Sequence, residues 1–450
     1  MTGTTTTKGA AAAAPTPLSA AYRTVWRWHF WAGLISLPFL MLMALTGAIY
    51  LFKPEIDDWQ TRRVAAIAAP SAANATLPSA WTRAALAEIP GRVASVLVPA
   101  RADRAVRVTV EATDGSRRAV FVDPANARVT GHVPAEGLTE TVKKIHSLIL
   151  FGPGLNIVVE IVAGWAIILV ATGIFLWWPR PREAGVVTVR ARAGRPLWRD
   201  IHAVTGLYAG AAIAFLAVTG MPWSAVWGDQ VMGAARQAGF GRPAAPAASE
   251  WVHAEHADAP LGVGWSLEHA GMTAPAAPIA LDRVLASVEA SGLPRPYAVT
   301  LPASPDRAVT AAFQNTRSED ARVLYLDRSG IPLRDVTAAD FGTGARAFEW
   351  GIAVHQGTQY GQINRWIMLL ACVAVWVLSV SALMMWWKRR PKGRLAAPVA
   401  PPGPRAKVAV LAIVLPLAIL YPLTGLSLVV AVVLDRIVAR VRRPASTAPV

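Results

Sequence analysis

Four long apolar stretches constrain the fold of this 450-residue chain more than any other feature of its sequence. A membrane-spanning helix needs about 20 predominantly apolar residues, and each stretch is that long: 28–52, 157–178, 201–223 and 366–387. Charged residues make up only 16% of the chain, against roughly 25% in soluble domains. We therefore expect a helical membrane protein in a lipid bilayer and not a soluble enzyme.

The distribution of basic residues predicts the orientation of these spans, because Lys and Arg accumulate on the cytoplasmic side of short loops. Residues 1–27 and the connectors 179–200 and 388–407 carry net charges of +3, +4 and +7, which is most of the chain's total of +16. The long segments 53–145 and 228–354 are close to neutral, so we expect them on the periplasmic side of a bacterial inner membrane. The positive charge is thus a topology signal, and nucleic acid is not an expected partner.

The spans and connectors together predict the order of segments along the chain. We expect transmembrane helices within 26–52, 146–178, 201–227 and 355–387, and a C-terminal membrane segment at 408–434. Pro416 and Pro422 interrupt this last run, which is either one kinked span or a shallow hairpin. The other segments are a cytoplasmic tail (1–25), two basic cytoplasmic loops (179–200 and 388–407), two outside domains (53–145 and 228–354) and a final tail (435–450).

Both outside segments have the pattern of small α+β units. Each has a helical stretch followed by three runs with alternating or β-branched residues and then a turn signal. In the first segment these are 80–88, then 94–98, 105–111 and 118–122; in the second they are 281–290, then 298–301, 308–313 and 322–326. The matching order predicts two copies of one domain.

Four histidines occupy matching positions in this internal repeat. His29 and His202 are both followed at +4 by Gly and at +17 and +18 by Thr-Gly. His146 and His355 both have Glu at −6, Gly at +6 and Trp-Trp at +31 and +32. Two copies with the same orientation are related by an axis along the membrane normal. His29 and His202 are therefore expected near the inner face, and His146 and His355 near the outer face.

Histidines at membrane depth are costly and suggest a functional site, and neutral imidazole is a common ligand of metals and haem. Cys372 is the only cysteine, so covalent haem attachment through C-x-x-C-H is excluded. We predict two non-covalent haem groups with bis-histidine ligation, by His29 with His202 and by His146 with His355. Pairing of the two histidines within each half is the alternative to these pairs. For any single histidine, a plain interfacial role is the alternative to haem binding.

Other polar residues allow more than one interpretation. Arg365 could bind a haem propionate or another carboxylate, and a mutual ion pair with Glu160 or snorkelling to the interface explains it equally well. A Pro- and Ala-rich stretch between 227 and 280 could chelate iron or be solvated, and it contains His253, His256 and His269. No dinucleotide or phosphate-binding fingerprint is present, so an electron donor would be external.

Several of these motifs resemble the PepSY-associated transmembrane family. They are Val-Phe-Val-Asp-Pro at 120–124, Thr46-Gly47, Trp177-Trp178-Pro179, Pro222-Trp223-Ser224 and the basic run 386–390, and the resemblance covers about residues 20–440. It implies an α-helical membrane protein with four core transmembrane helices in two tandem repeats, a C-terminal hydrophobic segment and two extracytoplasmic α+β (PepSY-like) domains.

Some members of this family are di-haem reductases of ferric siderophores. The resemblance implies an oxidoreductase for iron acquisition that contains two b-type haem groups. It would take electrons from a cytoplasmic or membrane donor and reduce a ferric siderophore or other ferric chelate in the periplasm. The axial ligands would be His29, His146, His202 and His355. The alternatives are a haem-free PepSY-domain regulator or sensor that binds a peptide or protein, and a transporter.

Overall fold

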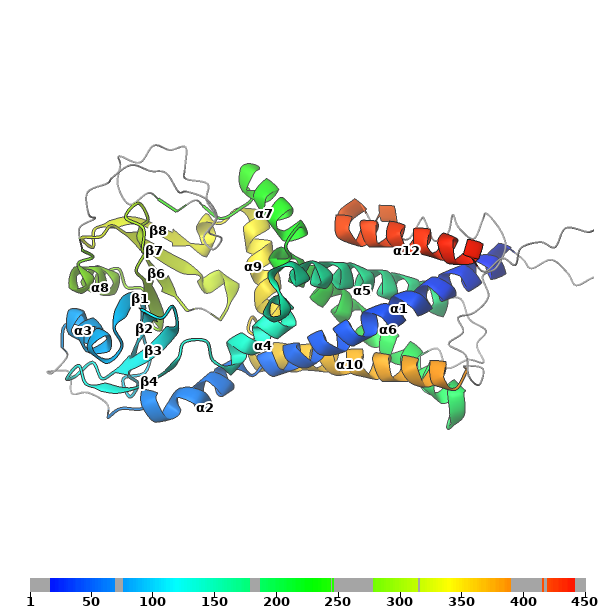
Figure 1. Ribbon diagram of the computed structural model, residues 1–450, viewed down its shortest axis with the longest axis horizontal. Coiled ribbons are helices and arrows are strands. Elements are labelled where there is room, and N and C mark those ends of the chain that lie inside the picture. The colour runs from blue at the N-terminus through cyan, green and yellow to red at the C-terminus, as the bar shows by residue number, and fades with distance from the viewer. Residues whose placement is uncertain are drawn as a thin grey trace, which may run out of the picture. The chain divides into compact units, whose positions relative to one another are not determined.

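The computed structural model describes residues 17–68, 76–178, 187–243, 245–246, 278–314, 316–389, 415–416 and 419–441. The chain divides into two compact units, each assembled from separate parts of the sequence. One, here called the helical unit, comprises Met1–Leu45, Gly154–Trp227 and Leu370–Val450. The other, here called the sheet unit, comprises Thr46–Pro153 and Gly228–Leu369 (Figure 1).

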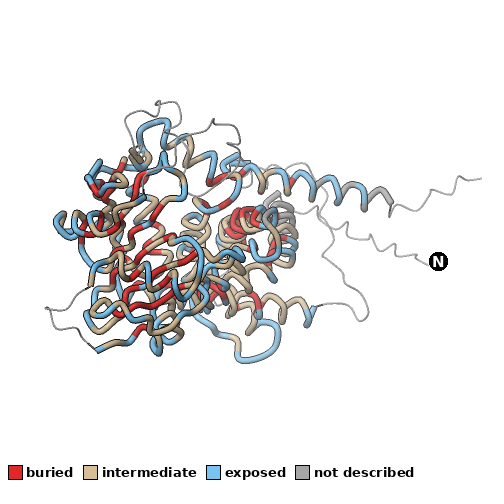
Figure 2. Tube along the Cα trace, turned by 60° about the vertical axis from the view of Figure 1, so that its left-hand side comes forward, coloured by how far each residue is buried: buried red, intermediate tan, exposed pale blue. Residues whose placement is uncertain are grey.

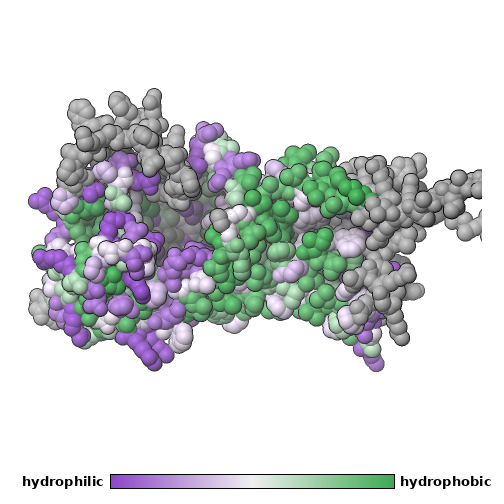
Figure 3. All heavy atoms as spheres, in the orientation of Figure 1, coloured by the Kyte–Doolittle hydropathy of each residue, from purple (hydrophilic) through white to green (hydrophobic). Residues whose placement is uncertain are grey.

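Within the described residues, four helices are long and apolar enough to cross a membrane. Their membrane-compatible parts are Val25–Tyr50, Asn156–Trp177, Gly194–Trp223 and Gly361–Trp387. They belong to α1 (Pro17–Tyr50), α5 (Asn156–Trp177), α6 (Gly194–Gly220), which continues into η3 (Met221–Trp223), and α10 (Gly361–Trp387). A helix satisfies its backbone N–H and C=O groups internally, as a hydrocarbon environment requires. The surface over α1 and α5 is accordingly mostly hydrophobic (Figure 3), and this agrees with the four predicted spans.

A further helix, α12 (Pro422–Val441), packs against α5. Its contact depends on Gly164, because a Cβ atom there would lie 2.0 Å from Thr424 Oγ1. Next to it, Trp165 Nε1 donates a hydrogen bond of 3.0 Å to Ser427 Oγ. Residues 408–414, 417 and 418 of the predicted C-terminal membrane segment lie outside the described residues. The later part of that segment forms the start of α12, with Pro422 in the first turn, where proline is tolerated.

One antiparallel sheet of eight strands forms the centre of the sheet unit, in the order β4-β3-β2-β1-β5-β6-β7-β8. The two chain segments meet where β1 pairs with β5, with Ser95 opposite Thr300 and Val98 opposite Tyr297. The strands are β1 (Gly91–Val98), β2 (Val106–Ala112), β3 (Arg117–Val122), β4 (Val129–Pro134), β5 (Tyr297–Thr300), β6 (Val309–Phe313), β7 (Arg322–Leu326) and β8 (Pro332–Thr337).

This shared sheet differs from the two separate domains that the sequence predicts at 53–145 and 228–354. The physical reason lies in the edges of the sheets. A separate domain would leave β1 or β5 as an edge strand with unpaired N–H and C=O groups, and edge strands pair readily with other strands. Pairing β1 with β5 satisfies both edges at once.

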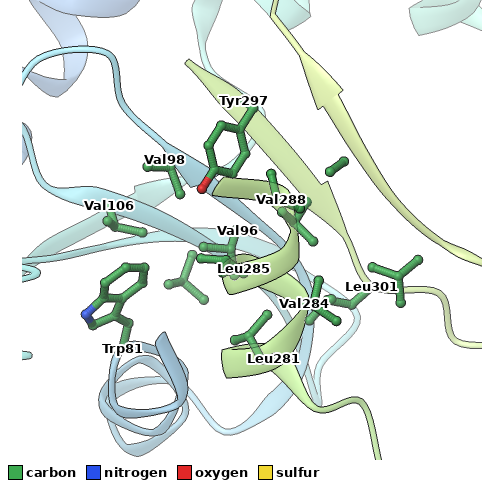
Figure 4. Close-up of a cluster of buried hydrophobic side chains, with 14 of the residues drawn as sticks. Trp81, Val96, Val98, Val106, Leu281, Val284, Leu285, Val288, Tyr297 and Leu301 are labelled. Carbon is green, nitrogen blue, oxygen red and sulfur yellow. The ribbon is translucent and has the colours of Figure 1, made fainter. Parts of the chain in front are cut away.

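Two helices cover one face of the sheet and contribute to its core. Trp81 of α3 (Pro78–Glu88) and Leu285 of α8 (Leu281–Ala290) point toward Val96 of β1 (Figure 4). In β2 buried residues alternate with more exposed ones, as in a pleated strand: Val106, Val108 and Val110 are buried. In β3, Ala119 and Phe121 are also buried, in a second cluster with Ala65 of α2. Buried positions concentrate along the central strands (Figure 2). The two helices contact each other, and the Ser79 N–H donates to Asp282 Oδ1 over 2.7 Å.

The order of elements recurs in the two halves. In the first half α3 and strands β1 to β4 lead to α4 (Leu138–His146); in the second, α8 and strands β5 to β8 lead to α9 (Thr343–His355). The last strand of each set, β4 and β8, was not predicted, because these strands contain Gly131 or Pro332 and have few buried residues. The remaining named elements are α2 (Lys53–Ala65), α7 (Trp227–Gln237), η1 (Ile149–Phe151), η2 (Pro153–Leu155), η5 (Ser318–Asp320) and η6 (Ala338–Asp340).

The pairing of β1 with β5 predicts a disulfide between engineered cysteines. In a Cys372→Ser background, Ser95→Cys with Thr300→Cys is expected to crosslink on mild oxidation. Directly opposite Cα atoms in an antiparallel pair lie about 4.5–5.5 Å apart, which suits a disulfide. Peptide mass spectrometry after digestion measures the link.

Ser95→Cys with Thr310→Cys is the matched control. Thr310 pairs with Thr300 on the far side of β5, so it lies two strand spacings, about 9–10 Å, from Ser95. Crosslinking of the control as readily as the test pair would contradict the single sheet.

Candidate cofactor site

A cavity of about 530 Å³ lies among α1, α5, α6 and α10 in the helical unit. This volume is within the range of roughly 300–1,000 Å³ that is usual for small-molecule and cofactor sites. Its walls are mostly aliphatic and aromatic side chains, together with glycines from three helices. Apart from the aromatic residues, the polar or charged side chains that line it are His29, Arg195, Arg199, His202, Ser379 and Arg389.

His29 of α1 and His202 of α6 face each other in this cavity. Their ring centroids are 6.4 Å apart and the ring planes are nearly perpendicular, at 86°. An imidazole nitrogen binds a first-row metal at about 2 Å, and the ring centroid lies about 1 Å behind that nitrogen, so two imidazoles on opposite sides of one metal have centroids about 6 Å apart. The observed separation therefore suits two axial ligands of one metal ion.

The hydrogen bond of His29 determines which ring nitrogen is free. His29 Nδ1 lies 2.8 Å from Thr172 Oγ1 on α5. The Thr172 hydroxyl donates its own proton to the Ile168 carbonyl oxygen at 2.6 Å, so its oxygen accepts a hydrogen bond from His29 Nδ1–H. In a neutral imidazole the other nitrogen then carries the lone pair. Nε2 of His29 is left able to bind a metal.

His202 has the same arrangement. Its Nδ1 lies 3.1 Å from the Leu378 carbonyl oxygen and 3.1 Å from Ser381 Oγ. A carbonyl oxygen only accepts, so Nδ1 of His202 carries the proton and Nε2 carries the lone pair. Hydrogen bonds of this kind from the second ring nitrogen fix the orientation of metal-binding histidines.

The two hydroxyl residues were not predicted from the sequence, although a signal for them exists. Thr172 follows His146 by 26 residues, and Ser381 follows His355 by the same 26 residues. They are thus equivalent in the repeat, and each binds the histidine of the preceding membrane-compatible helix in its own half: Thr172 binds His29 of α1 and Ser381 binds His202 of α6. A search of the repeat for matched hydroxyls as well as matched histidines finds both.

Glycine keeps the space next to His29 open. A Cβ atom at Gly173 would lie only 3.4 Å from His29 Cε1, closer than most such contacts. Gly33 and Gly206, which the repeat aligns, also line the cavity, and a Cβ atom at either would meet a leucine side chain at 3.7 Å. The aligned glycines therefore widen the cavity, whereas Gly173 preserves the position of the ring.

The other predicted site residues lie in the sheet unit, outside the cavity lining. His146 is the last residue of α4 and His355 is the last residue of α9. His146 Nδ1 lies 2.9 Å from Oγ1 of Thr46, which belongs to the repeated Thr-Gly pair. His253, His256 and His269 lie outside the described residues. In the described parts of the chain, no three His, Cys, Asp or Glu side chains gather as a metal site.

Arg365 and Glu160 have partners other than those predicted. Arg365 forms an ion pair with Glu55 of α2 and lies 5.7 Å from the Phe52 ring centroid. Glu160 is fully buried, and its Oε2 accepts the N–H groups of Val226 and Trp227 at 3.1 Å each. The predicted ion pair of Arg365 with Glu160 is therefore wrong, because each has another partner. Binding of a haem propionate by Arg365 stays a prediction. The Glu160 carboxylate instead binds the start of α7, where helix N–H groups favour an anion.

Comparison with known families places the chain in one of them. Residues 26–389 match the PepSY-associated TM region, which is most of the chain, and the protein belongs to this family, as its motifs predicted. The matched region includes the whole sheet, α5, α6, α10 and all but the start of α1, whereas α12 follows it. No curated protein matches the chain.

The hydrogen bonds of the cavity predict the tautomers of its histidines. In cofactor-free protein, His29 and His202 are expected to carry the proton on Nδ1, because Thr172 and the Leu378 carbonyl accept from it. Thr172→Val keeps the shape of the side chain but removes the acceptor, so His29 should lose this preference while His202 keeps it. Selective ¹⁵N-histidine labelling and NMR measure the tautomers.

His132 is the internal reference for that experiment. It lies on β4, with a half-exposed side chain 3.8 Å from Glu88, and should be the same in both proteins. A proton on Nε2 of His29 in the wild type would contradict the assignment.

The ion pair of Arg365 predicts a small acid sensitivity. Burial acts to raise the pKa of Glu55, but the hydrogen bond and the charge of Arg365, together with a backbone hydrogen bond, outweigh burial and lower this pKa below its ordinary value. Such a group stabilises the folded state above its unfolded pKa of about 4.3, and the stabilisation is lost as pH falls through the lowered folded pKa. Glu55 is 53% exposed, so the effect is at most about 1 kcal/mol.

Thermal unfolding of Glu55→Gln and wild-type protein in detergent tests this expectation. The variant should unfold at a lower temperature at pH 7, and the difference should shrink at pH 3, where the carboxylate becomes protonated. A difference that stays constant with pH would show that the ion pair contributes nothing.

Proposed function

We propose that this protein binds two non-covalent b-type haem groups, each through two histidines, and carries electrons across the membrane. The observation that supports this most strongly is the pair His29 and His202, whose rings have the separation of two ligands of one metal ion and whose Nδ1 hydrogen bonds leave the lone pair on Nε2. This site joins the two halves of the repeat, as the cross-repeat pairing requires.

The residues of the cavity fit such a group in three respects. The donors are two neutral imidazoles with their second nitrogens fixed by hydrogen bonds, which raises their basicity as ligands. The walls are apolar and the cavity is large enough for a cofactor. Glycines on α1, α5 and α6 let a flat ligand approach the helix backbones. When bound, haem supplies one-electron Fe(III)/Fe(II) chemistry.

The second pair, His146 and His355, is supported by its place in the repeat. Each histidine ends the helix that precedes a membrane-compatible helix of its own half. Thr46 holds Nδ1 of His146 by a hydrogen bond, as Thr172 holds His29. We therefore assign the second bis-histidine site to His146 and His355.

The direction of transfer follows from the distribution of charge. The basic connectors 179–200 and 388–407 are assigned to the cytoplasmic side of a bacterial inner membrane, so His29 and His202 would receive electrons from a cytoplasmic or membrane donor. His146 and His355 would deliver them to a ferric siderophore or another ferric chelate in the periplasm. Each haem group would be held by two histidines of the chain, and the chemistry that it would supply is outer-sphere electron transfer. Reduction to Fe(II) weakens binding by hard oxygen ligands and releases iron.

The proposal predicts the haem content of histidine variants. Purified wild-type protein is expected to contain two b-type haem groups per chain, and His202→Ala and His146→Ala are each expected to retain one. The double variant of His29 and His202 should also retain one if the pairs join the two halves, and none if each pair lies within one half. Reduced-minus-oxidised visible spectra and a pyridine assay measure the content.

His132→Ala is the matched control and should retain two groups, because His132 lies on β4 with an exposed side chain. Colourless wild-type protein from haem-replete cells would refute electron transfer and leave a haem-free regulator as the better explanation. If haem is present, reduction of ferric chelates by the dithionite-reduced protein is the next assay.

A further inference from the structure

Positive charge gathers at one end of the cavity. Arg199 and Arg195 precede His202 on α6 by three and seven residues, so they lie on the same helix face as His202. At 1.5 Å per residue they are about 4.5 and 10.5 Å from it along the helix axis. Both line the cavity, which therefore changes along α6 from a histidine level to a basic level.

A third arginine reaches the same end from another helix. Arg389 is the second residue after the end of α10 and also lines the cavity. Its guanidinium lies 4.6 Å from the ring centroid of Trp26, and Trp26 precedes His29 on α1 by three residues, as Arg199 precedes His202. We call Arg195, Arg199 and Arg389 the arginine rim.

The charge of the arginine rim is not balanced within the cavity. None of the residues that the structure places in the lining is acidic. The nearest carboxylate along the chain, Asp200, is paired with Arg199 at 2.9 Å and also accepts the backbone N–H groups of Arg190 and Ala191. Asp200 can thus offset one of the three positive charges at most.

We infer that the arginine rim binds the two carboxylates of a planar, otherwise apolar ligand whose centre lies between His29 and His202. Guanidinium groups bind carboxylates through paired, charge-assisted hydrogen bonds, and the aliphatic and aromatic walls beyond the rim suit the apolar body of the ligand. This inference rests on the proposed function and adds to it the orientation of the inner haem group, with its propionates toward the basic connectors. Arg365 does not line this cavity, so it is not part of this inference.

The test compares two ligands that differ only in their carboxylates. Ferric haem b and its dimethyl ester are titrated into haem-depleted, full-length protein in detergent, and binding is followed by the visible spectrum. All proteins in this test carry His146→Ala, so that only the inner site binds, and the one with an intact arginine rim is called the wild type. We expect the wild type to prefer the free acid by at least about tenfold, which is the value of one charge-assisted hydrogen bond. The triple variant Arg195→Gln, Arg199→Gln, Arg389→Gln should bind both ligands equally, with the weaker constant of the ester.

Two further variants control for folding and for general charge. The corresponding triple Arg→Lys variant keeps the charge and should retain part of the preference for the acid. Arg236→Gln on α7 removes an exposed arginine that does not line the cavity and should behave as the wild type. A second readout is the reduction potential, which should fall in the glutamine variant because nearby positive charge favours the reduced iron.

The outcomes separate this inference from the proposed function. If haem binds through His29 and His202 but the glutamine variant keeps the preference for the acid, the arginine rim is not the carboxylate site. Equal binding of acid and ester by the wild type would overturn the inference in the same way. If neither ligand binds to the wild type, the proposed function fails and this inference fails with it.

Discussion

The hydrogen bonds that hold the two histidine rings between helices are the interactions on which the candidate site depends. An imidazole N–H in apolar surroundings needs an acceptor, because leaving it unpaired costs about 1–3 kcal/mol. Thr172 supplies this acceptor to His29, and Leu378 and Ser381 supply it to His202. Each bond also links neighbouring helices, so the bonds that orient the rings also set the spacing of α1 with α5 and of α6 with α10.

The repeat explains why the site has two matching sides. Equivalent residues of the two halves face one cavity from opposite helices, and the hydroxyl residues behind the histidines are equivalent too. A symmetric cavity of this kind suits a ligand with two equivalent axial positions. The arginine rim breaks the symmetry, since Arg195 and Arg199 of the second half have no basic counterparts at Tyr22 and Trp26 of the first. This asymmetry along and across the cavity favours one orientation of a bound ligand over the other.

The duplication of the chain has a different structural result in the sheet unit. Two four-stranded segments share one sheet through β1 and β5, and α3 and α8 pack side by side over their common face. Joining the sheets pairs two edges and forms one large core instead of two small ones. It also ties together the two long segments that carry His146 and His355 at their ends.

The sequence by itself determined the membrane class, the four spans, the repeat and the matched positions of His29, His146, His202 and His355, because hydropathy, charge and spacing are properties of the chain alone. The helices at 80–88 and 281–290 and three strands in each half were also predictable from their periodicity. Only the tertiary structure decided that His29 faces His202, that Arg365 pairs with Glu55 and that β1 joins β5. These contacts join residues that are far apart in the chain. For each of them several partners of similar chemistry are available, such as other hydrogen-bond acceptors, carboxylates or strand edges. The local sequence pattern therefore cannot select the partner.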